Sequence, residues 1–233
     1  FFRFIPETKP ETPAEKQGES ILSTLAGYRL VLRDYAFMAF IICGILMLVV
    51  YQQLYNTLSV YLRDVHNLDP RRYGFLLTTS AITVVLFQFS VTRWIRHRPP
   101  FVMIALGTLF YAIGFGMFGF VKAYALFALA VIIITVGEMI SVPTSQSLAT
   151  NFAPEDMRGR YMAMFGLGWA IPQTIGPAAA GMIIDNLNPN LLWYIGGLLC
   201  IISAFGYLVL HARLGRQKRF APAPREPLTA QAS

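Results

Sequence analysis

The chain has 233 residues and a net charge of +7, and 55% of its residues are hydrophobic while only 13% are charged. A water-soluble protein of this size could not bury so many apolar side chains, because a fold of roughly 150 to 300 residues leaves much of its surface in water. The composition excludes an ordinary soluble domain and predicts an integral membrane protein, whose Lys and Arg residues flank apolar runs as partners of anionic lipid headgroups and not of nucleic acid.

The first 34 residues precede the first long apolar run. Residues 1–20 are predicted to form a cytoplasmic linker, because Pro6–Ser20 is charged, rich in Pro and without apolar periodicity. Phe1–Ile5 resemble the last turn of a preceding apolar helix and the chain has no initiator Met, so we expect a fragment of a longer protein. Residues 21–34 mix apolar residues with Arg and Tyr, which predicts an interfacial helix lying on the membrane.

Six apolar runs between residues 35 and 212 are long enough to cross a bilayer, for which about 20 apolar residues are needed. The predicted spans are Tyr35–Leu62, Tyr73–Thr92, Phe101–Val121, Tyr124–Thr150, Tyr161–Ile184 and Leu191–His211. Their connections are short, so neighbouring helices must be antiparallel. The predicted fold class is an all-α integral membrane protein with a six-transmembrane-helix bundle at 35–212. Asp69–Pro70 is a typical helix start, because a capping acid and a first-turn Pro suit the free amides there.

The distribution of Lys and Arg predicts the orientation of the bundle. Of the 19 Lys and Arg residues, all but Arg63, Arg71, Arg72 and Lys122 lie on the side of the two chain ends. Short segments rich in these residues stay inside the cell, so we expect a multi-pass protein of the plasma (inner) membrane with both chain ends cytoplasmic. Residues 213–233 are predicted to be a basic, disordered cytoplasmic tail.

Cysteine and histidine residues do not indicate a disulfide framework or a metal site. Cys43 and Cys200 lie within apolar runs, where packing is the expected role, and the three His residues lie in loops or at helix ends without metal-ligand spacing. An intramembrane protease would need a Ser with a His partner in another span, and the sequence has no such pair. We therefore expect no metal, no cofactor and no enzymatic activity.

The fourth span carries the most informative residue. Glu138 is a lone carboxylate in the apolar run Tyr124–Leu148, and an acid at bilayer depth usually faces a partner or a water-filled cavity. On a helix with 3.6 residues per turn, the same face also carries Thr135, Ser141 and Ser145. The functional interpretation is that Glu138 binds a proton or a cationic group, with Ser141 and Ser145 beside the same pathway. The alternative is a structural carboxylate that is bonded to a neighbouring helix.

A polar stretch, Tyr51–Thr57, interrupts the first span after a nearly unbroken apolar run. Gln52 and Asn56 share one helical face with Tyr55 adjacent, and Gln53 completes this set of candidate pathway residues. Amides and phenols donate and accept hydrogen bonds without charge, and aromatic faces attract organic cations, as a broad-specificity pocket requires. The alternative is hydrogen bonding between helices, at about 0.6 to 2 kcal/mol per contact.

The fifth span combines prolines and small residues with two candidate pathway residues, Trp169 and Gln173, which share a face. Proline removes a backbone hydrogen bond and localises bending, and small residues let helices approach closely. This span is predicted to be a moving gate element, with ordinary tight packing as the alternative. The residues assigned to gating or close packing in the chain are Pro143, Pro172, Gly176, Pro177 and Gly181.

Four charged residues gather in the connection before the fifth span: Glu155, Asp156, Arg158 and Arg160. They could act as a cytoplasmic latch that holds one conformation closed. Exposed ion pairs are usually worth less than about 1 kcal/mol, so a topology signal is the competing explanation.

Three motifs point to a family: Gly137-Glu138-x4-Pro143, the loop Ala153–Tyr161, and Gly176-Pro177-x3-Gly181. Together with the six spans they resemble the C-terminal half of a major facilitator superfamily transporter, most closely the drug:proton antiporter branch. The resemblance covers essentially the whole chain, with the spans matching helices seven to twelve. It implies one half of a twelve-helix fold built as a 3+3 inverted repeat, whose partner is the missing N-terminal six-helix half. In this superfamily the part of helix seven that corresponds to the polar stretch lines the substrate path.

The resemblance implies half of a secondary active transporter that moves a small molecule by alternating access. Proton-coupled efflux of drug-like or amphipathic compounds is the first hypothesis, with the substrate and protons as partners. Two alternatives stay open at this point. One is uptake or export of a sugar or another metabolite by the same fold, and the other is a six-helix membrane subunit without transport activity of its own.

Overall fold

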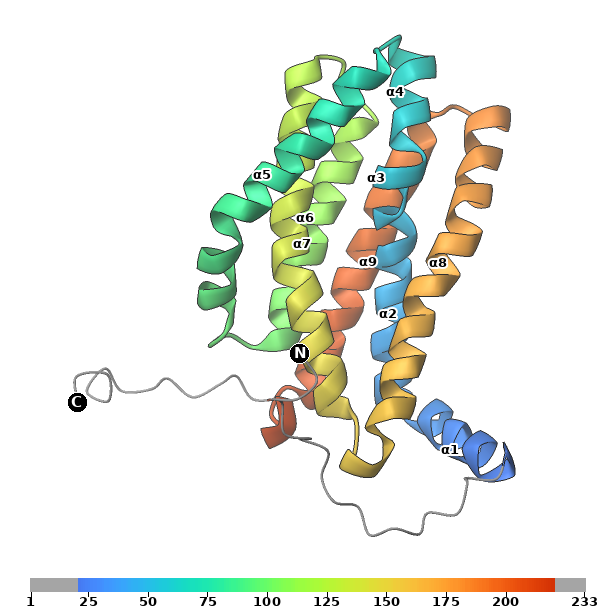
Figure 1. Ribbon diagram of the computed structural model, residues 1–233, viewed down its shortest axis with the longest axis vertical. Coiled ribbons are helices and arrows are strands. Elements are labelled where there is room, and N and C mark those ends of the chain that lie inside the picture. The colour runs from blue at the N-terminus through green and yellow to red at the C-terminus, as the bar shows by residue number, and fades with distance from the viewer. Residues whose placement is uncertain (1–20, 221–233) are drawn as a thin grey trace, which may run out of the picture.

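A computed structural model of the protein describes residues 21–220, and within this range every regular element is a helix (Figure 1). The predicted linker 1–20 and the end of the predicted tail, 221–233, lie outside the described residues. The helices are α1 (Ile21–Arg33), α2 (Tyr35–Tyr51), α3 (Gln53–Asn56), α4 (Leu58–His66), α5 (Pro70–Ile95), α6 (Pro100–Phe118), α7 (Tyr124–Phe152), α8 (Arg158–Asn186) and α9 (Asn190–Leu214), with short 3₁₀ turns η1 (Glu155–Met157) and η2 (Lys218–Phe220).

The six predicted spans correspond to long helices that run up and down the molecule, with boundaries that differ by a few residues (Figure 1). The predicted start at Asp69–Pro70 is confirmed, because α5 begins at Pro70 and the Asp69 carboxylate accepts a hydrogen bond from the Arg71 amide at 2.7 Å. The first predicted span differs most. It is divided into α2, α3 and α4, with interruptions at Gln52 and Thr57 in the polar stretch.

Five helical segments of the described chain are long and apolar enough to cross a membrane: Tyr35–Asn56, Pro70–Ile95, Pro100–Phe118, Tyr124–Phe152 and Asn190–Leu214. The fifth predicted span, Tyr161–Ile184, lies within α8, which has the length of its neighbours but is not among these five. Its larger apolar residues are diluted by Gly, Ala, Pro and polar residues, which lowers the mean hydropathy of the helix.

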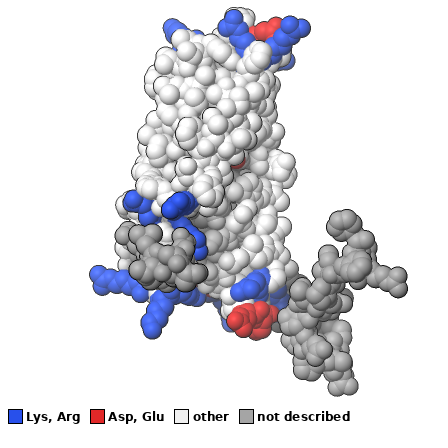
Figure 2. Space-filling view, turned by 60° about the vertical axis from the view of Figure 1, so that its left-hand side comes forward, with Lys and Arg blue, Asp and Glu red and all other residues white. Residues whose placement is uncertain are grey.

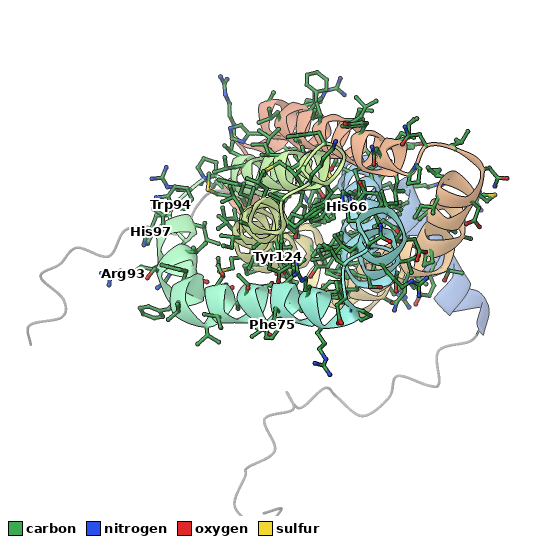
Figure 3. All side chains as sticks on the ribbon, turned by 90° about the horizontal axis from the view of Figure 1, so that it is seen from above. His66, Phe75, Arg93, Trp94, His97 and Tyr124 are labelled. Carbon is green, nitrogen blue, oxygen red and sulfur yellow. The ribbon has the colours of Figure 1, made fainter. Side chains whose placement is uncertain are left out.

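The central helix of the bundle is α6, which packs most extensively against α7 and α9. On one side α5 packs against α7, and on the other side α2 joins α9 to α8. Seen from above, α5 and α8 therefore lie on opposite flanks of the bundle (Figure 3).

Each end of the bundle has a cluster of buried aromatic side chains that packs its helices together. At the upper end of the bundle, where α9 begins (Figure 1), the structure packs three rings together: the Trp193 ring lies 5.1 Å from the rings of both Tyr61 and Phe118. Toward the lower end, the Phe152 ring lies 4.6 Å from that of Phe220. The Tyr61 hydroxyl also donates to the Phe118 carbonyl at 2.9 Å, so the buried phenol has a hydrogen-bond partner within the upper cluster.

The predicted disorder of the tail is wrong for residues 213–220. The last long helix continues to Leu214, and Phe220 in η2 is buried against Phe152. Burying the Phe220 ring removes a large apolar area from water, which the basic character of the segment did not indicate. Near this end Asp34 caps α2 and also accepts a hydrogen bond from the Tyr161 hydroxyl at 3.0 Å, which ties α8 to the α1–α2 corner.

Charged side chains gather at the two ends of the molecule and leave an almost uncharged belt between them (Figure 2). The lower end in Figure 1 carries the connections Arg93–Pro100 and Asn151–Arg160, which contain most of the Lys and Arg residues found outside the chain ends. A belt without charge between two charged ends is the pattern that a bilayer requires of a spanning bundle.

Candidate functional site

Glu138 lies at the midpoint of α7 and is the one charged residue of that helix. Its side chain is half-buried, and its carboxylate accepts a hydrogen bond of 2.6 Å from the Tyr51 hydroxyl at the end of α2. The Tyr51 hydroxyl in turn lies 3.1 Å from the Tyr55 hydroxyl in α3. We call these three side chains the tyrosine–glutamate chain. It links α7 to the interrupted first span at the middle of the bundle.

The direction of the hydrogen bonds in this chain depends on the charge of Glu138. A phenol has one proton, so when Tyr51 donates to an ionised carboxylate, the bond between the two phenols must be donated by Tyr55. A protonated Glu138 has a proton of its own to donate, which allows Tyr51 to accept from it and to donate toward Tyr55. Gain or loss of one proton can therefore reverse the whole chain.

The interruption of the first span is stabilised by side chains around it. Tyr73 in α5 donates to the Leu54 carbonyl at 3.0 Å, which pairs a carbonyl in the interrupted region. Within the same segment the Gln53 amide donates to the Val49 carbonyl at 2.8 Å, and the Thr57 hydroxyl donates to the Gln53 side-chain oxygen at 2.6 Å. Irregular backbone at membrane depth persists where such partners satisfy it. These hydrogen bonds thus stabilise the interruption.

Two hollows flank the middle and lower part of α7. A cavity of about 240 Å³ between α5 and α7 is lined by Glu138 and Gln146 from α7 and by Gln88 from α5. A more open hollow of about 530 Å³ lies between α7 and α8, where Gln146 faces Trp169. Gln146 borders both hollows, so α7 presents Glu138 and Gln146 to the space between the flanking helices α5 and α8.

The other polar residues of the predicted α7 face do not accompany Glu138. Thr135 is fully buried and its hydroxyl donates to the Ser80 hydroxyl of α5 at 2.8 Å. Ser141 is fully buried and bonds to the Gly137 carbonyl within its own helix. Ser145 lines a small apolar cavity that α7 shares with α2 and α8. One predicted face is therefore divided among several neighbours, and this placement does not support a pathway role for Ser141 or Ser145.

The candidate residues of the polar stretch separate into exposed and buried members. Tyr55 and Asn56 are exposed and Gln52 is half-buried, whereas Gln53 is buried and holds the interruption together. The structure thus assigns a packing contact to Gln53. It leaves Gln52, Tyr55 and Asn56 available on the surface as predicted pathway residues.

The residues predicted to gate the pathway differ in their surroundings. Gly176 faces the interrupted span, because a Cβ atom added to it would lie 2.8 Å from the Gln53 amide nitrogen. A Cβ atom added to Gly181 would meet no atom within 4 Å, so Gly181 makes no close helix contact among the described residues. The backbone is helical through Pro143, Pro172 and Pro177. The observed interruptions lie instead in the first span, which has no proline there.

The remaining predicted residues lie near the surface. Gln173 is exposed and Trp169 is half-buried on α8. In the charged connection, Glu155, Asp156 and Arg158 are exposed and form no ion pair with one another or with other described residues, whereas the Arg160 side chain lies directly over Gly27 of α1. The predicted cluster is therefore not assembled as one network within residues 21–220.

Sequence reasoning missed Tyr51, Gln88 and Gln146 as site residues. The spacing of four residues between Tyr51 and Tyr55 was a usable signal, because such residues stack on one helical face. Gln146 lies eight residues after Glu138, about 80° around the helix from it, so it is on an adjoining part of the same side and could also have been found. No sequence signal pointed to Gln88, because its position depends on how α5 packs against α7.

Cysteine labelling separates pathway residues from packing residues. In a full-length protein without other cysteines, we expect Asn56→Cys to react with a membrane-impermeant thiol reagent in at least one conformational state. Gln53→Cys is the matched control and should stay unreactive, because Gln53 is buried. Complete protection of Asn56→Cys in every state would contradict a pathway role for this residue.

Comparison with known proteins gives the family. A family model described as the Major Facilitator Superfamily matches residues 1–177 and 153–232. A protein named Na(+), Li(+), K(+)/H(+) antiporter from Planococcus maritimus is 26% identical over 210 residues, covering 81% of this chain and 48% of that protein. The uncharacterized MFS-type transporter YdeE of Escherichia coli (strain K12) is 28% identical over 197 residues, covering 81% of this chain and 49% of the relative.

A solved structure shares the fold. It is the crystal structure of a POT family transporter in complex with a thioalcohol-conjugated peptide, which matches with a TM-score of 0.69 at 17% identity. The match covers 83% of this chain and 46% of that chain, and this chain likewise spans about half the length of the curated relatives named above. Because the family model matches almost the whole chain, this all-helical membrane protein belongs to the Major Facilitator Superfamily.

Proposed function

We propose that the chain forms the C-terminal six-helix half of a secondary transporter that moves a small molecule by alternating access. The lengths of chain that match the relatives support a half-transporter, and the six long helices support its division into two groups of three. In this proposal the side of the bundle that presents Glu138 and Gln146 between α5 and α8 faces the N-terminal half, the outer face of α5 is left to lipid, and both chain ends are cytoplasmic. The transported molecule then passes between the two halves near the middle of the membrane.

The observation that carries the proposal is the tyrosine–glutamate chain beside the hollows of α7. A carboxylate at the midpoint of a membrane helix is costly to place there, so such residues usually have a function. Here the carboxylate is half-buried and accepts a hydrogen bond from a donor at 2.6 Å. It also borders a cavity of about 240 Å³, so solvent and substrate can reach it. We propose that Glu138 carries the coupled proton and that its protonation state biases the position of the first span through Tyr51.

Two classes of substrate fit this site. Drug-like or amphipathic organic cations suit the Glu138 carboxylate, with the Tyr55 ring in the tyrosine–glutamate chain and the Trp169 ring in the hollow between α7 and α8 as further attractive surfaces. Monovalent metal cations suit the same carboxylate with phenol oxygens as further ligands, because hard cations prefer oxygen. The second class is favoured by the name of the Planococcus maritimus relative, a Na(+), Li(+), K(+)/H(+) antiporter. Proton-coupled efflux of organic cations is our first proposal, and cation/proton antiport is the second.

The proposal is tested with the full-length protein in proteoliposomes under an imposed pH gradient. Lipophilic cations, sodium, potassium and small sugars are each offered as substrates, and proton movement is followed by an internal pH dye. Proton movement that only an organic cation elicits supports the first proposal, and a response to sodium or potassium supports the second. A response to sugar alone favours metabolite transport. No response to any pH gradient or substrate would contradict proton-coupled transport and favour a structural subunit.

The close contact at Gly176 provides a test of gating by α8. Gly176→Leu should reduce transport by the full-length protein at least about tenfold, because the new side chain would displace Gln53 and separate α8 from the first span. Gly181→Leu on the same helix is the matched control and should transport normally, since no described atom lies within 4 Å of a Cβ atom there. The measurement is the initial transport rate of each variant at equal amounts of protein in the membrane. Full activity of Gly176→Leu would contradict a gating contact.

A further inference from the structure

A third hollow lies at the lower end of the bundle, where α5 ends and α6 begins. It measures about 420 Å³, and its described lining comes from the α5–α6 connection and from the last turns of α7. Two arginines, Arg96 and Arg98, stand on one side, and Ser147 and Asn151 of α7 stand on the other. The hollow is distinct from the site of Glu138, which is absent from its lining.

The lining has the chemistry of an anion site. It holds two guanidinium groups, three hydroxyls and an amide, and its described residues include no acid. The Thr92 hydroxyl accepts a hydrogen bond from the Gln88 amide at 3.0 Å, so its own proton is available to donate into the hollow. Guanidinium groups bind the oxygens of a phosphate through paired donors, and hydroxyls add further donors.

The surroundings of the hollow indicate that the anion belongs to a lipid. The outer face of α5 just above it is apolar and open, with Val85 exposed by 81% and Phe89 by 79%. Below these residues the Trp94 ring is 44% exposed, and the Arg98 guanidinium lies 4.2 Å from its centroid. Exposed Trp beside Arg is typical of the level of lipid headgroups. Acyl chains can therefore lie on α5 while the headgroup reaches the arginines. A free phosphate has no acyl chains and would make no contact with this apolar face.

We propose that this hollow binds the phosphate headgroup of an anionic phospholipid, with Arg96 and Arg98 as its cationic ligands and Thr92 and Ser147 as hydroxyl donors. The acyl chains of the lipid lie along the exposed apolar face of α5. The site joins the α5–α6 connection to α7, so an occupied site holds the lower ends of these helices together. This inference does not depend on the transported substrate.

The test measures lipid binding to the delipidated full-length protein in detergent. Phosphatidylglycerol is titrated, and native mass spectrometry gives the apparent Kd of the tightest bound lipid. The double variant Arg96→Gln, Arg98→Gln should bind about 30-fold more weakly, because each Lys or Arg near a lipid surface contributes on the order of 1 kcal/mol. The matched control is Arg71→Gln, Arg72→Gln at the opposite end of α5, where Arg72 also stacks on an aromatic ring. The control should bind within about twofold of the wild type, as expected for arginines outside the hollow.

A second variant leaves both charges in place. Ser147→Trp should fill the hollow from α7 and weaken phosphatidylglycerol binding by a similar factor, and its exposed position makes correct folding expected. Phosphatidylcholine, which has no net charge, should bind to every variant with the same apparent Kd as to the wild type. Unchanged phosphatidylglycerol binding in the Arg96, Arg98 variant, or an equal loss in the Arg71, Arg72 control, would overturn the proposal. Displacement of the lipid by millimolar inorganic phosphate would show a small-anion site and overturn the lipid assignment.

Discussion

Glu138→Gln is expected to abolish proton-driven transport by the full-length protein while leaving its amount in the membrane unchanged. The glutamine amide has the shape of the carboxylic acid and its oxygen can still accept the hydrogen bond from Tyr51, so the packing of α7 against α2 is preserved. Glutamine cannot exchange a proton, so the tyrosine–glutamate chain would lose its two protonation states. Substrate movement coupled to an imposed pH gradient should fall to the level of empty proteoliposomes.

Substrate exchange distinguishes loss of coupling from loss of binding. If Glu138 carries only the proton, Glu138→Gln should still exchange labelled for unlabelled substrate at equal pH on both sides, because that reaction needs no net proton movement. Glu155→Gln is the matched control, since Glu155 is exposed in η1 at the end of the bundle, and it should transport at the wild-type rate. Proton-driven transport by Glu138→Gln at more than half the wild-type rate would remove Glu138 from the coupling role.

Gly137→Ala is expected to destabilise the bundle strongly at the contact between α6 and α7. A Cβ atom at residue 137 would lie 2.5 Å from the Gly107 carbonyl oxygen and 3.0 Å from the Phe110 Cβ. A backbone carbonyl cannot move aside as a flexible side chain can, so α6 and α7 must separate. Overpacking of this kind costs roughly 1 to 3 kcal/mol, and α6 with α7 forms one of the largest contacts of the bundle.

The measurement is the apparent Tm of the full-length protein in detergent, followed by the fluorescence of a thiol-reactive dye that reports exposure of buried cysteines. Gly116→Ala in α6 is the matched control, because a Cβ atom there would meet no described atom within 4 Å. The control should melt at the wild-type temperature or slightly above it, since Ala favours a helix more than Gly does. Equal Tm values for Gly137→Ala and the wild type would mean that α6 and α7 can separate enough for the new Cβ atom without loss of stability, which would contradict the prediction.

Much of the fold could be predicted from the sequence because the deciding quantities are local. The length and hydropathy of each apolar run follow from consecutive residues, and the short connections leave antiparallel packing as the arrangement available. The all-helical fold class is confirmed. The prediction of six spans was less accurate for Tyr161–Ile184, because this flanking helix carries many Gly, Pro and polar residues and has a lower hydropathy than the other long helices.

Site residues were harder to predict than the fold, as α7 demonstrates. Helical periodicity correctly grouped Thr135, Ser141 and Ser145 near Glu138 by angle, yet the four side chains meet different neighbours. Because α7 has neighbouring helices on several sides, a difference of a few tens of degrees decides whether a side chain meets α5, α6 or α2. Periodicity in one helix contains no information about those neighbours.

The sequence by itself determined that this chain is a membrane bundle with an acid at mid-depth. Burying apolar surface and placing a charge in lipid both involve large free energies, and each depends mainly on the residues of a single segment. Only the tertiary structure decided which groups meet that acid. Tyr51 reaches Glu138 across 87 positions of sequence, because α2 ends at the level where α7 carries its carboxylate. Contacts between helices depend on rotation and depth, which packing of the whole bundle sets.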